Sequence, residues 1–452
     1  PLETLLNEMV LLNGYVPTTH TMGTLDWTKV VYPDTTPAYL INHPTLTRTR
    51  TQYTQDGRVL AEKEGTLATI EDPSNRTQYR YNPLGQLLEA IVPDGDRNPN
   101  NNPSTTYRYD TAGRRTHSTD ANGYTTEYKY DELGRLVKTI FADETYTQTK
   151  YDNLGRRVKF IDPEGKVTQY KYDDLGRLVG VIETLYPGEA NEKKLETSYG
   201  YDEAGRLVWT EDAESRRTKY EYDDAGRRTV VELPEGMRSV TTYDAAGNVK
   251  TVTDFNGEVM RYLYDEQHRL ELKDLEDDAD VTYTYTPDGQ IETLTDGRGT
   301  TTFRYDELGR LIERLDPAGP YLLNGQGLNY SIGYRYDEAG NISQVRTPAG
   351  EVEYSYDEQN RLETVTSDGE TTRYLYDDGG NLRETQFPNG VIERRSYDEL
   401  NRLDVLEVVR DGMLLSRFDY TVNDAGHRLE VIESLRQPDG TLKERTVRYG
   451  YD

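Results

Sequence analysis

The chain has 452 residues, of which 81 are Asp or Glu and 53 are Lys or Arg, so its formal net charge is −28. This acidic excess argues against nucleic-acid binding, which needs a basic face, and against attraction to anionic lipid. The chain contains no cysteine, which excludes disulfides, thiol nucleophiles and cysteine-based zinc sites. An acidic surface could hold a basic partner, but it more often serves solubility.

Hydrophobic residues make up 34% of the chain, and 38 residues are tyrosine, so few aliphatic side chains remain for a dry core. Such a polar, charged composition alone would suggest disorder. Tyrosine argues for a fold, because its ring buries a large area while its hydroxyl tolerates water. We therefore expect thin layers that are wet on their sides, and not one thick core.

Residues 1–52 lack the repeat that fills the rest of the chain, and we expect them to be a plug, a join to an upstream domain or degenerate strands. The sequence shows no run of 18 apolar residues and no signal peptide, so no membrane span is predicted in this segment. The chain begins with proline and ends at Tyr451-Asp452, which would open another repeat. We therefore expect a segment of a longer protein, truncated at its C-terminal end.

Residues 53–452 are dominated by an internal repeat, and internal repeats decide a fold. The marker is the dipeptide Tyr-Asp, which recurs mostly in steps of 21 residues, with local insertions at residues 189–192 and 322–325. Tyr285 keeps the register although threonine follows it. The markers are Tyr53, Tyr81, Tyr109, Tyr130, Tyr151, Tyr172, Tyr201, Tyr222, Tyr243, Tyr264, Tyr285, Tyr305, Tyr336, Tyr356, Tyr376, Tyr397, Tyr420 and Tyr451.

One unit reads Tyr-x-Tyr-Asp-x-x-Gly-Arg-Leu, as in residues 128–136. Asp suits the first position of a type I turn, and Gly supplies the positive φ that follows. The pattern predicts a three-residue hairpin with a G1 bulge. A second turn of the same kind, in which Pro fixes φ, is expected half a repeat later. Examples are residues 162–165, 233–236, 286–289, 316–319, 347–350 and 387–390.

Each repeat is thus predicted to be strand, turn, strand, turn, with strands of roughly six or seven residues. Helix is disfavoured because Gly or Pro interrupts the chain about every ten residues. The two rings of Tyr-x-Tyr share one face by the period of two. Apolar residues after Arg, such as Leu362 and Val365, fall on opposite faces unless a bulge intervenes, and both possibilities stay open.

This pattern predicts an all-β fold, a meander on the order of 34 strands spaced about 4.8 Å apart. Open twisted sheets rarely exceed about 10 strands without curling. The sheet would therefore wind as a hollow spiral or break into propeller blades or a narrow solenoid. Composition favours the hollow form. Equivalent tyrosines lie two strands apart, so the rings should form a stripe in which a residue from the intervening strand separates them.

The repeat units resemble the YD repeats of Rhs proteins, which also occur in the C subunits of insecticidal toxin complexes, in wall-associated contact-dependent toxins and in teneurins. The resemblance covers residues 53–452 and is carried by units such as residues 172–178 and 305–311. It implies a spiral β-shell that, in the bacterial members, surrounds a toxic C-terminal domain. The motif that ends the family's shells and supports self-cleavage by aspartates has no counterpart here, and no toxin domain is present.

No residue is predicted to be catalytic, to bind a cofactor or to ligate a metal. The histidines (His20, His43, His117, His268 and His427) stand at no ligand spacing. The turn aspartates, such as Asp131, have a complete structural explanation. The Gly-rich stretch at 295–299 precedes no helix, and the acidic run at 274–280 lacks the spacing of a calcium loop. Asn75, Asn329 and Asn341 match the glycosylation pattern at a near-chance frequency.

Two functions stay open beside a remote third, an enzyme. The first is a non-catalytic container segment of a secreted, bacterial protein, whose partners are the remaining shell, a C-terminal cargo domain and a delivery component. The second is an extracellular adhesive or structural surface protein, in which exposed tyrosines bind carbohydrate. Both place the chain outside the cell or at its surface, and neither involves nucleic acid.

Overall fold

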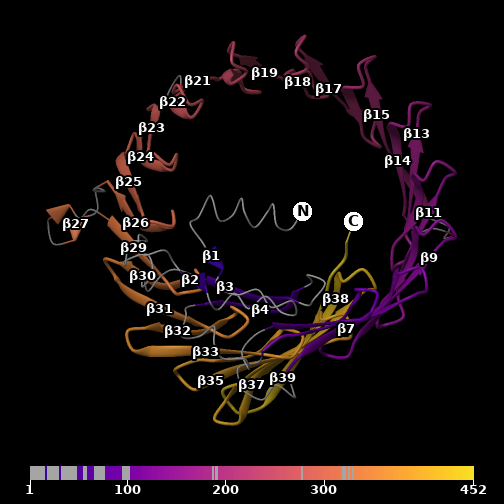
Figure 1. The fold of residues 1–452 in the computed structure, drawn as a ribbon, viewed down its shortest axis with the longest axis vertical. Coiled ribbons are helices and arrows are strands. Elements are labelled where there is room, and N and C mark those ends of the chain that lie inside the picture. The colour runs from indigo at the N-terminus through magenta and orange to yellow at the C-terminus, as the bar shows by residue number, and fades with distance from the viewer. Residues whose placement is uncertain are drawn as a thin grey trace. The chain divides into compact units, whose positions relative to one another are not determined.

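The computed structural model describes residues 16–17, 30–31, 48–53, 59–65, 77–93, 102–185, 188, 192–275, 278–317, 322–323, 326–327 and 330–451. All regular elements within these residues are β-strands (Figure 1). Strands β1 (Val16–Pro17) and β2 (Val30–Val31) form a short antiparallel pair. Most of residues 1–52, expected to be a plug, a join or degenerate strands, lies outside the described residues.

The chain divides into two compact units. Unit 1 comprises residues 1–145, 335–345 and 351–452, and unit 2 comprises residues 146–334 and 346–350. Strands β29 (Tyr330–Tyr336), β30 (Ile342–Thr347) and β31 (Gly350–Tyr356) contribute residues to both. The other strands of unit 1 are β3 (Arg48–Tyr53), β4 (Val59–Gly65), β5 (Thr77–Tyr81), β6 (Leu87–Ile91), β7 (Ser104–Tyr109), β8 (Arg115–Thr119), β9 (Thr125–Tyr130), β10 (Leu136–Ile140), β32 (Leu362–Ser367), β33 (Glu370–Tyr376), β34 (Leu382–Gln386), β35 (Val391–Tyr397), β36 (Leu403–Arg410), β37 (Met413–Val422), β38 (Arg428–Arg436) and β39 (Leu442–Arg448).

Unit 2 is a run of antiparallel hairpins in which β11 to β26 pair in chain order and β26 then pairs with β29. The insertion near residue 322 forms a separate ribbon, because β27 (Leu322–Leu323) pairs with β28 (Gln326–Gly327). The remaining strands are β11 (Tyr146–Tyr151), β12 (Arg157–Ile161), β13 (Val167–Tyr172), β14 (Leu178–Leu185), β15 (Lys193–Tyr201), β16 (Leu207–Glu211), β17 (Arg217–Tyr222), β18 (Arg228–Glu232), β19 (Arg238–Tyr243), β20 (Val249–Thr253), β21 (Val259–Tyr264), β22 (Leu270–Leu275), β23 (Val281–Tyr285), β24 (Ile291–Asp296), β25 (Gly299–Tyr305) and β26 (Leu311–Asp316).

The Tyr-Asp turns have the predicted geometry. At the hairpin between β15 and β16, the Gly205 N–H donates to the Asp202 carbonyl at 3.1 Å, and the Asp202 N–H donates to the Arg206 carbonyl at 3.0 Å. Gly205 has φ of 83°. A type I turn that ends in a left-handed glycine opposite the first residue is the G1 arrangement, so the strand-turn-strand-turn prediction is confirmed.

The half-repeat turns are confirmed at residues 162–165, 233–236 and 387–390, where the same two backbone hydrogen bonds close each turn. Two assignments were wrong. Residues 286–289 follow marker Tyr285 and form a Tyr-Asp-type turn. At residues 347–350 only Pro348 and Ala349 separate β30 from β31, which is too short for the G1 arrangement. The turn at 316–319 lies partly outside the described residues.

A bulge follows the marker tyrosine in the repeats and decides which residues share a face. In the β31–β32 hairpin, Tyr356 pairs with Leu362 and Tyr354 pairs with Val365, while Glu363 is the extra residue. Residues directly opposite in an antiparallel pair lie on one face. The two tyrosines therefore share a face with Leu362 and Val365, and the bulge corrects the period-two mismatch seen in the sequence.

Few of the described residues are buried away from solvent. The buried apolar residues among them are Ile91, Val230, Val409 and Val431, and no described side chain of any kind is below 2% exposure. This confirms the thin, wet-sided layers expected from the tyrosine-rich composition. Hydrogen bonds and half-buried rings must therefore carry stability that a globular domain obtains from a close-packed interior.

Candidate functional site

The Tyr-Asp turn is the chemically dense element of the repeat, and the turn at Asp202 is representative. One carboxylate oxygen accepts the Arg206 N–H at 2.8 Å, and the other accepts the Arg206 Nε–H at 2.7 Å. The backbone N–H of Arg206, its guanidinium and the N–H of Ala204 lower the pKa of the Asp202 carboxyl against the opposing effect of desolvation. The carboxylate is thus used as a fixed acceptor that shapes the turn.

The same arginine reaches the next repeat. Arg206 Nη1 donates to the carbonyl of Asp223 at 3.1 Å, and its guanidinium carbon lies 5.1 Å from the centre of the Tyr222 ring. This geometry is a cation–π contact. It recurs at 4.4 to 4.9 Å in the pairs Arg114–Tyr130, Arg156–Tyr172, Arg177–Tyr201, Arg227–Tyr243, Arg269–Tyr285 and Arg361–Tyr376.

The marker tyrosine completes the link in the opposite direction. The Tyr222 hydroxyl donates to the carbonyl of Leu207, the first residue of the intervening strand, at 2.7 Å. Burial raises the pKa of several marker tyrosines, including Tyr305 and Tyr397. Hydroxyls that donate in the same way belong to Tyr109, Tyr130, Tyr172, Tyr201, Tyr243, Tyr285, Tyr305, Tyr356, Tyr376, Tyr397 and Tyr451.

Two contacts therefore attach each repeat to the next. The turn arginine donates to a carbonyl in the following Tyr-Asp turn, and the following marker tyrosine donates to a carbonyl at the start of the strand between them. The arginine lies in the turn directly before the intervening strand and covers one face of the marker ring. Asparagine replaces the arginine in some turns, as at Asn248 and Asn381, where its amide still donates to the turn aspartate at 3.0 Å.

A second polar site joins distant hairpins within unit 1, and we call it the seam. It brings the half-repeat turns that follow β6, β8 and β10 against the Tyr-Asp turns that follow β31, β33 and β35. Gln359 Nε2 donates to the Pro93 carbonyl at 2.9 Å, and Asn401 Nδ2 donates to an Asp120 carboxylate oxygen at 3.1 Å.

Asn122 is the central residue of the seam. Its side-chain oxygen accepts the Gly379 N–H at 2.9 Å, and its amide donates to Asn401 Oδ1 at 3.1 Å. A Cβ at Gly379 would lie 2.2 Å from Asn122 Nδ2, so only glycine permits this approach. The turn at Gly379 is thus hydrogen-bonded to a hairpin that lies more than 250 residues earlier in the chain.

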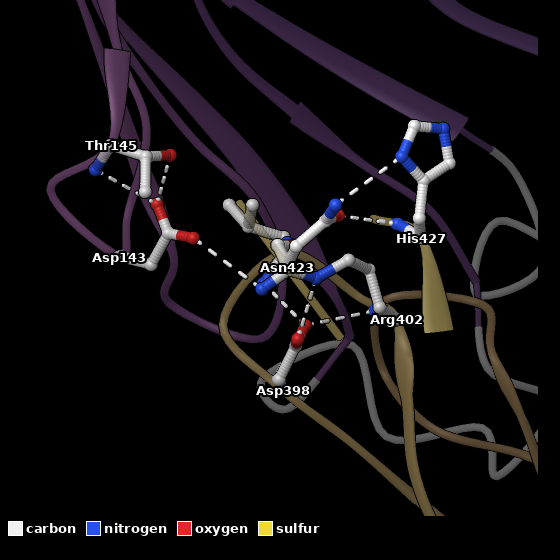
Figure 2. Close-up of polar contacts among 7 residues, drawn as sticks. Asp143, Thr145, Asp398, Arg402, Asn423 and His427 are labelled. Carbon is white, nitrogen blue, oxygen red and sulfur yellow. Dashed lines mark hydrogen bonds and ion pairs between the residues drawn. The ribbon is translucent and has the colours of Figure 1, made fainter. Parts of the chain in front are cut away.

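Figure 2 shows the other end of the seam. Arg402 binds its own turn aspartate, Asp398, at 2.6 Å and also reaches Asp143 at 3.5 Å. Asp143 accepts the Thr145 N–H at 3.0 Å and its hydroxyl at 2.6 Å, which fixes the carboxylate. A third donor of Arg402, Nη1, lies 3.3 Å from the Asn423 carbonyl.

The remaining residues considered in the sequence have structural surroundings. His117 lies in β8, His268 occupies a left-handed turn position with φ of 62°, and the His427 ring lies 5.1 Å from the Tyr451 ring. His20, His43, Asn75 and Asn329 fall outside the described residues. Asn341 donates to Asp337 and Asn360. Within the described ranges, no three His, Asp or Glu side chains are grouped closely enough to hold a metal ion.

One marker was placed wrongly. In the β37–β38 hairpin, Val422 pairs with Arg428, as Tyr397 pairs with Leu403 one repeat earlier. Val422 therefore holds the marker position, Asn423 holds the aspartate position, and Tyr420 is the first tyrosine of the Tyr-x-Tyr pattern. The pairs Tyr53–Val59 and Tyr81–Leu87 show that Tyr53 and Tyr81 both hold the marker position.

Comparison with known families gives two matches. The Teneurin YD-shell family matches residues 31–231. The RHS repeat family matches residues 243–279, 285–320, 336–373 and 356–392. A comparison with curated proteins found no match. The described part of the chain holds no helix with the length and apolar character needed to cross a bilayer.

Solved structures with the same fold are components of Tc toxins. The crystal structure of TcdB2-TccC3 without its hypervariable C-terminal region is 18% identical over 86% of this chain and 23% of that chain, with a TM-score of 0.57. The Photorhabdus luminescens Tc holotoxin pore with mutated TccC3 is 18% identical over 89% of this chain and 26% of that one, with a TM-score of 0.60. The chain therefore spans about a quarter of the length of these structures.

Proposed function

The chain belongs to the YD-repeat, or Rhs-repeat, family, and on that premise we propose that it is a wall segment of a shell that encloses a C-terminal toxin or effector domain of the same polypeptide. The Tc toxin components that share the fold support this proposal at the level of architecture. The shell would sequester its cargo by blocking access to substrate, and its limited volume would disfavour the compact folded state of the cargo.

The observation that carries the proposal is how the motif residues are used. The turn aspartate, the arginine and the marker tyrosine bind one another and the next repeat, as Asp202, Arg206 and Tyr222 do. These three residue types could otherwise perform acid–base chemistry or bind ligands. Because their polar groups hold hairpins together, the repeat is best understood as a wall element, and we propose that this segment is not an enzyme.

The seam supports enclosure in preference to an extended fibre. A straight tape of hairpins would place residues 120 and 401 far apart, yet Asp120 accepts a hydrogen bond from Asn401. The adhesive alternative depends on tyrosine faces that are free to stack on sugars. Many marker rings are instead covered by arginine, as in the Arg227–Tyr243 pair at 4.4 Å, which weighs against that alternative.

Limited proteolysis of the full-length polypeptide tests the proposal. A cargo domain that follows the repeats should resist protease while the repeats are intact, and it should be digested once the shell is opened by denaturant. Rapid digestion of that domain beside intact repeats would overturn enclosure. We further propose that the protein is secreted or displayed at the cell surface, and that a delivery component opens the shell.

A further inference from the structure

A cavity of about 320 Å³ lies in unit 1 beside the last complete hairpin. Its walls come from the Tyr-Asp turn before β36, from the ends of β37 and β38, and from the segment after β39. The residues that line it are Arg402, Leu403, Tyr420, Val422, Gly426, Arg428, Tyr449 and Tyr451. An engineered apolar cavity of about 150 Å³ already accepts benzene, so this one has room for a single aromatic ring.

The cavity lies where the aromatic ring of a marker tyrosine is missing from the repeat. Val422 holds the marker position, which is tyrosine in the other described hairpins of this type in which the pairing is defined. Two repeats earlier, Tyr376 lies 4.4 Å under the Arg361 guanidinium, and its hydroxyl donates to the Leu362 carbonyl at 2.8 Å. The equivalents of Arg361 and Leu362 are Arg402 and Leu403, and both line the cavity.

The groups that would receive a phenol are fixed in place. Arg402 is fixed by Asp398 at 2.6 Å and by the Asn423 carbonyl at 3.3 Å, so its guanidinium plane cannot turn freely. Among the hydrogen bonds of the described residues, none from a side chain reaches the Leu403 carbonyl. On the opposite side, the Tyr451 hydroxyl donates to the Arg428 carbonyl at 2.8 Å, and Arg428 lies 4.5 Å over the Tyr420 ring.

We propose that this cavity binds a phenolic ring, with the ring face against Arg402 and the hydroxyl donating to the Leu403 carbonyl. The chemistry is that of the neighbouring repeats, with an external phenol in place of the marker side chain. A cation–π contact and one hydrogen bond in a preformed slot favour a planar ring with a donor over an aliphatic or hydroxyl-free ring. The ring can be a free small phenol or a tyrosine of another polypeptide.

Isothermal titration with 4-methylphenol tests the site. The chain should bind one equivalent with a dissociation constant on the order of 1 mM or tighter. Val422→Tyr restores the missing ring, so this variant should bind at least tenfold more weakly and should melt no earlier than the parent chain. Toluene should bind at least fivefold more weakly than 4-methylphenol. Equal binding of 4-methylphenol to the parent and to Val422→Tyr, or no binding to either, would overturn the proposal.

Tyr376→Val is the matched gain-of-site variant, because Tyr376 lies under the Arg361 guanidinium and its hydroxyl donates to the Leu362 carbonyl. It should raise the stoichiometry to two, and combining it with Val422→Tyr should return it to one. A short acetylated peptide with the pattern Tyr-x-Tyr-Asp separates the two sources of phenol. Tighter binding than 4-methylphenol points to a polypeptide, and equal binding points to a small phenol. If the peptide and 4-methylphenol do not compete, the assignment is wrong.

Discussion

Single residues of the repeat have separable roles in the wall. The aspartate fixes the turn through its own backbone and side-chain acceptors, as Asp202 does with Arg206. The arginine binds the next turn, and the tyrosine hydroxyl binds the strand between them. Each contact is partly exposed to solvent, so each contributes little to the free energy of unfolding. The array is stable because the contacts are repeated along it.

The tyrosine hydroxyl can be tested by itself with Tyr222→Phe. The substitution keeps the ring under Arg206 but removes the donor to the Leu207 carbonyl, so we expect a loss of about 1 kcal/mol. Urea unfolding followed by circular dichroism measures it. Tyr264→Phe is the control, because within the described residues the hydroxyl of this marker makes no hydrogen bond. Equal losses in both variants would refute the role given to the hydroxyl.

Turn aspartates should make the wall sensitive to acid. The folded pKa of Asp202 is lowered, chiefly by the Arg206 N–H, so unfolded chains bind its proton at a higher pH than folded chains do. The resulting stabilisation is complete above the ordinary pKa of about 3.9 and is lost as the pH falls through the folded value.

The matched variant for this effect is the double substitution Asp202→Asn with Arg206→Gln. It copies the natural turn in which the Asn82 amide donates to Gln86 at 2.6 Å. We expect the unfolding midpoint of this variant to depend less on pH between pH 4.5 and 2.5 than that of the parent chain. An unchanged dependence would show that Asp202 does not contribute to acid sensitivity.

Residue identity was predictable where one local rule governs it. The Asp-to-Gly spacing demands a left-handed residue, and the turns at Asp131 and Asp202 have the predicted form. The assignment of Tyr420 failed because valine replaces the marker tyrosine while the preceding Tyr-x-Tyr residue is retained. Only strand pairing, in which Val422 faces Arg428, distinguishes the two positions.

The stability of each hairpin depends on the residue at the left-handed position of its turn. Some turns place a residue other than glycine at the left-handed position, for example Ser215 with φ of 63°. A side chain in this conformation costs roughly 1 kcal/mol or more. These turns are therefore weak points of an otherwise regular array.

Ser215→Gly should stabilise the β16–β17 hairpin by about 1 kcal/mol, because the strain is removed while the hydrogen bond to the Asp212 carbonyl is kept. Differential scanning calorimetry or the urea midpoint measures the gain. Glu235→Gly is the control in the next half-repeat turn. That position does not need a positive φ, so added chain entropy should make the control neutral or destabilising. Stabilisation by both changes would contradict the argument.

At the level of the element, the sequence predicted the strands, the turns and the G1 bulge of each turn, but it left open the second bulge, which lies in the strand after the turn. Leu362 and Val365 looked as if they belonged to opposite faces, and the extra residue Glu363 brings them together. Bulges of this kind have no dedicated residue signature, since the extra residue is Glu363 in one hairpin and Val137 in another, so strand pairing was needed to locate them. The two-residue turn at Pro348-Ala349 was missed because Pro and Gly suit several turn types.

The largest-scale contact that the structure defines is the seam of unit 1. Its residues come from turns that look like all the others in sequence, and which turns face each other depends on how far the sheet winds before it returns. The double glycine at Gly379-Gly380 is the only local hint, since the first of the two is needed for the approach to Asn122.

A double-mutant cycle tests the seam. Gly379→Ala should destabilise the chain, because a Cβ would collide with Asn122, and Asn122→Ala should remove part of that penalty. We expect a coupling of about 1 kcal/mol and faster hydrogen exchange in both β9 and β34. Asn256→Ala is the control at the equivalent turn position of unit 2, where the side-chain amide binds Asp254 and, among the described residues, no other group. Additive effects of the two seam substitutions would rule out direct contact.

Electron cryomicroscopy of the full-length polypeptide tests the central claim most directly. We expect one continuous hairpin sheet that coils past its own earlier turns at Asn122 and Gly379, with weak density for an unfolded cargo inside it. Separate compact domains, blades around an axis, or a cargo domain that is folded and lies outside the sheet would contradict it.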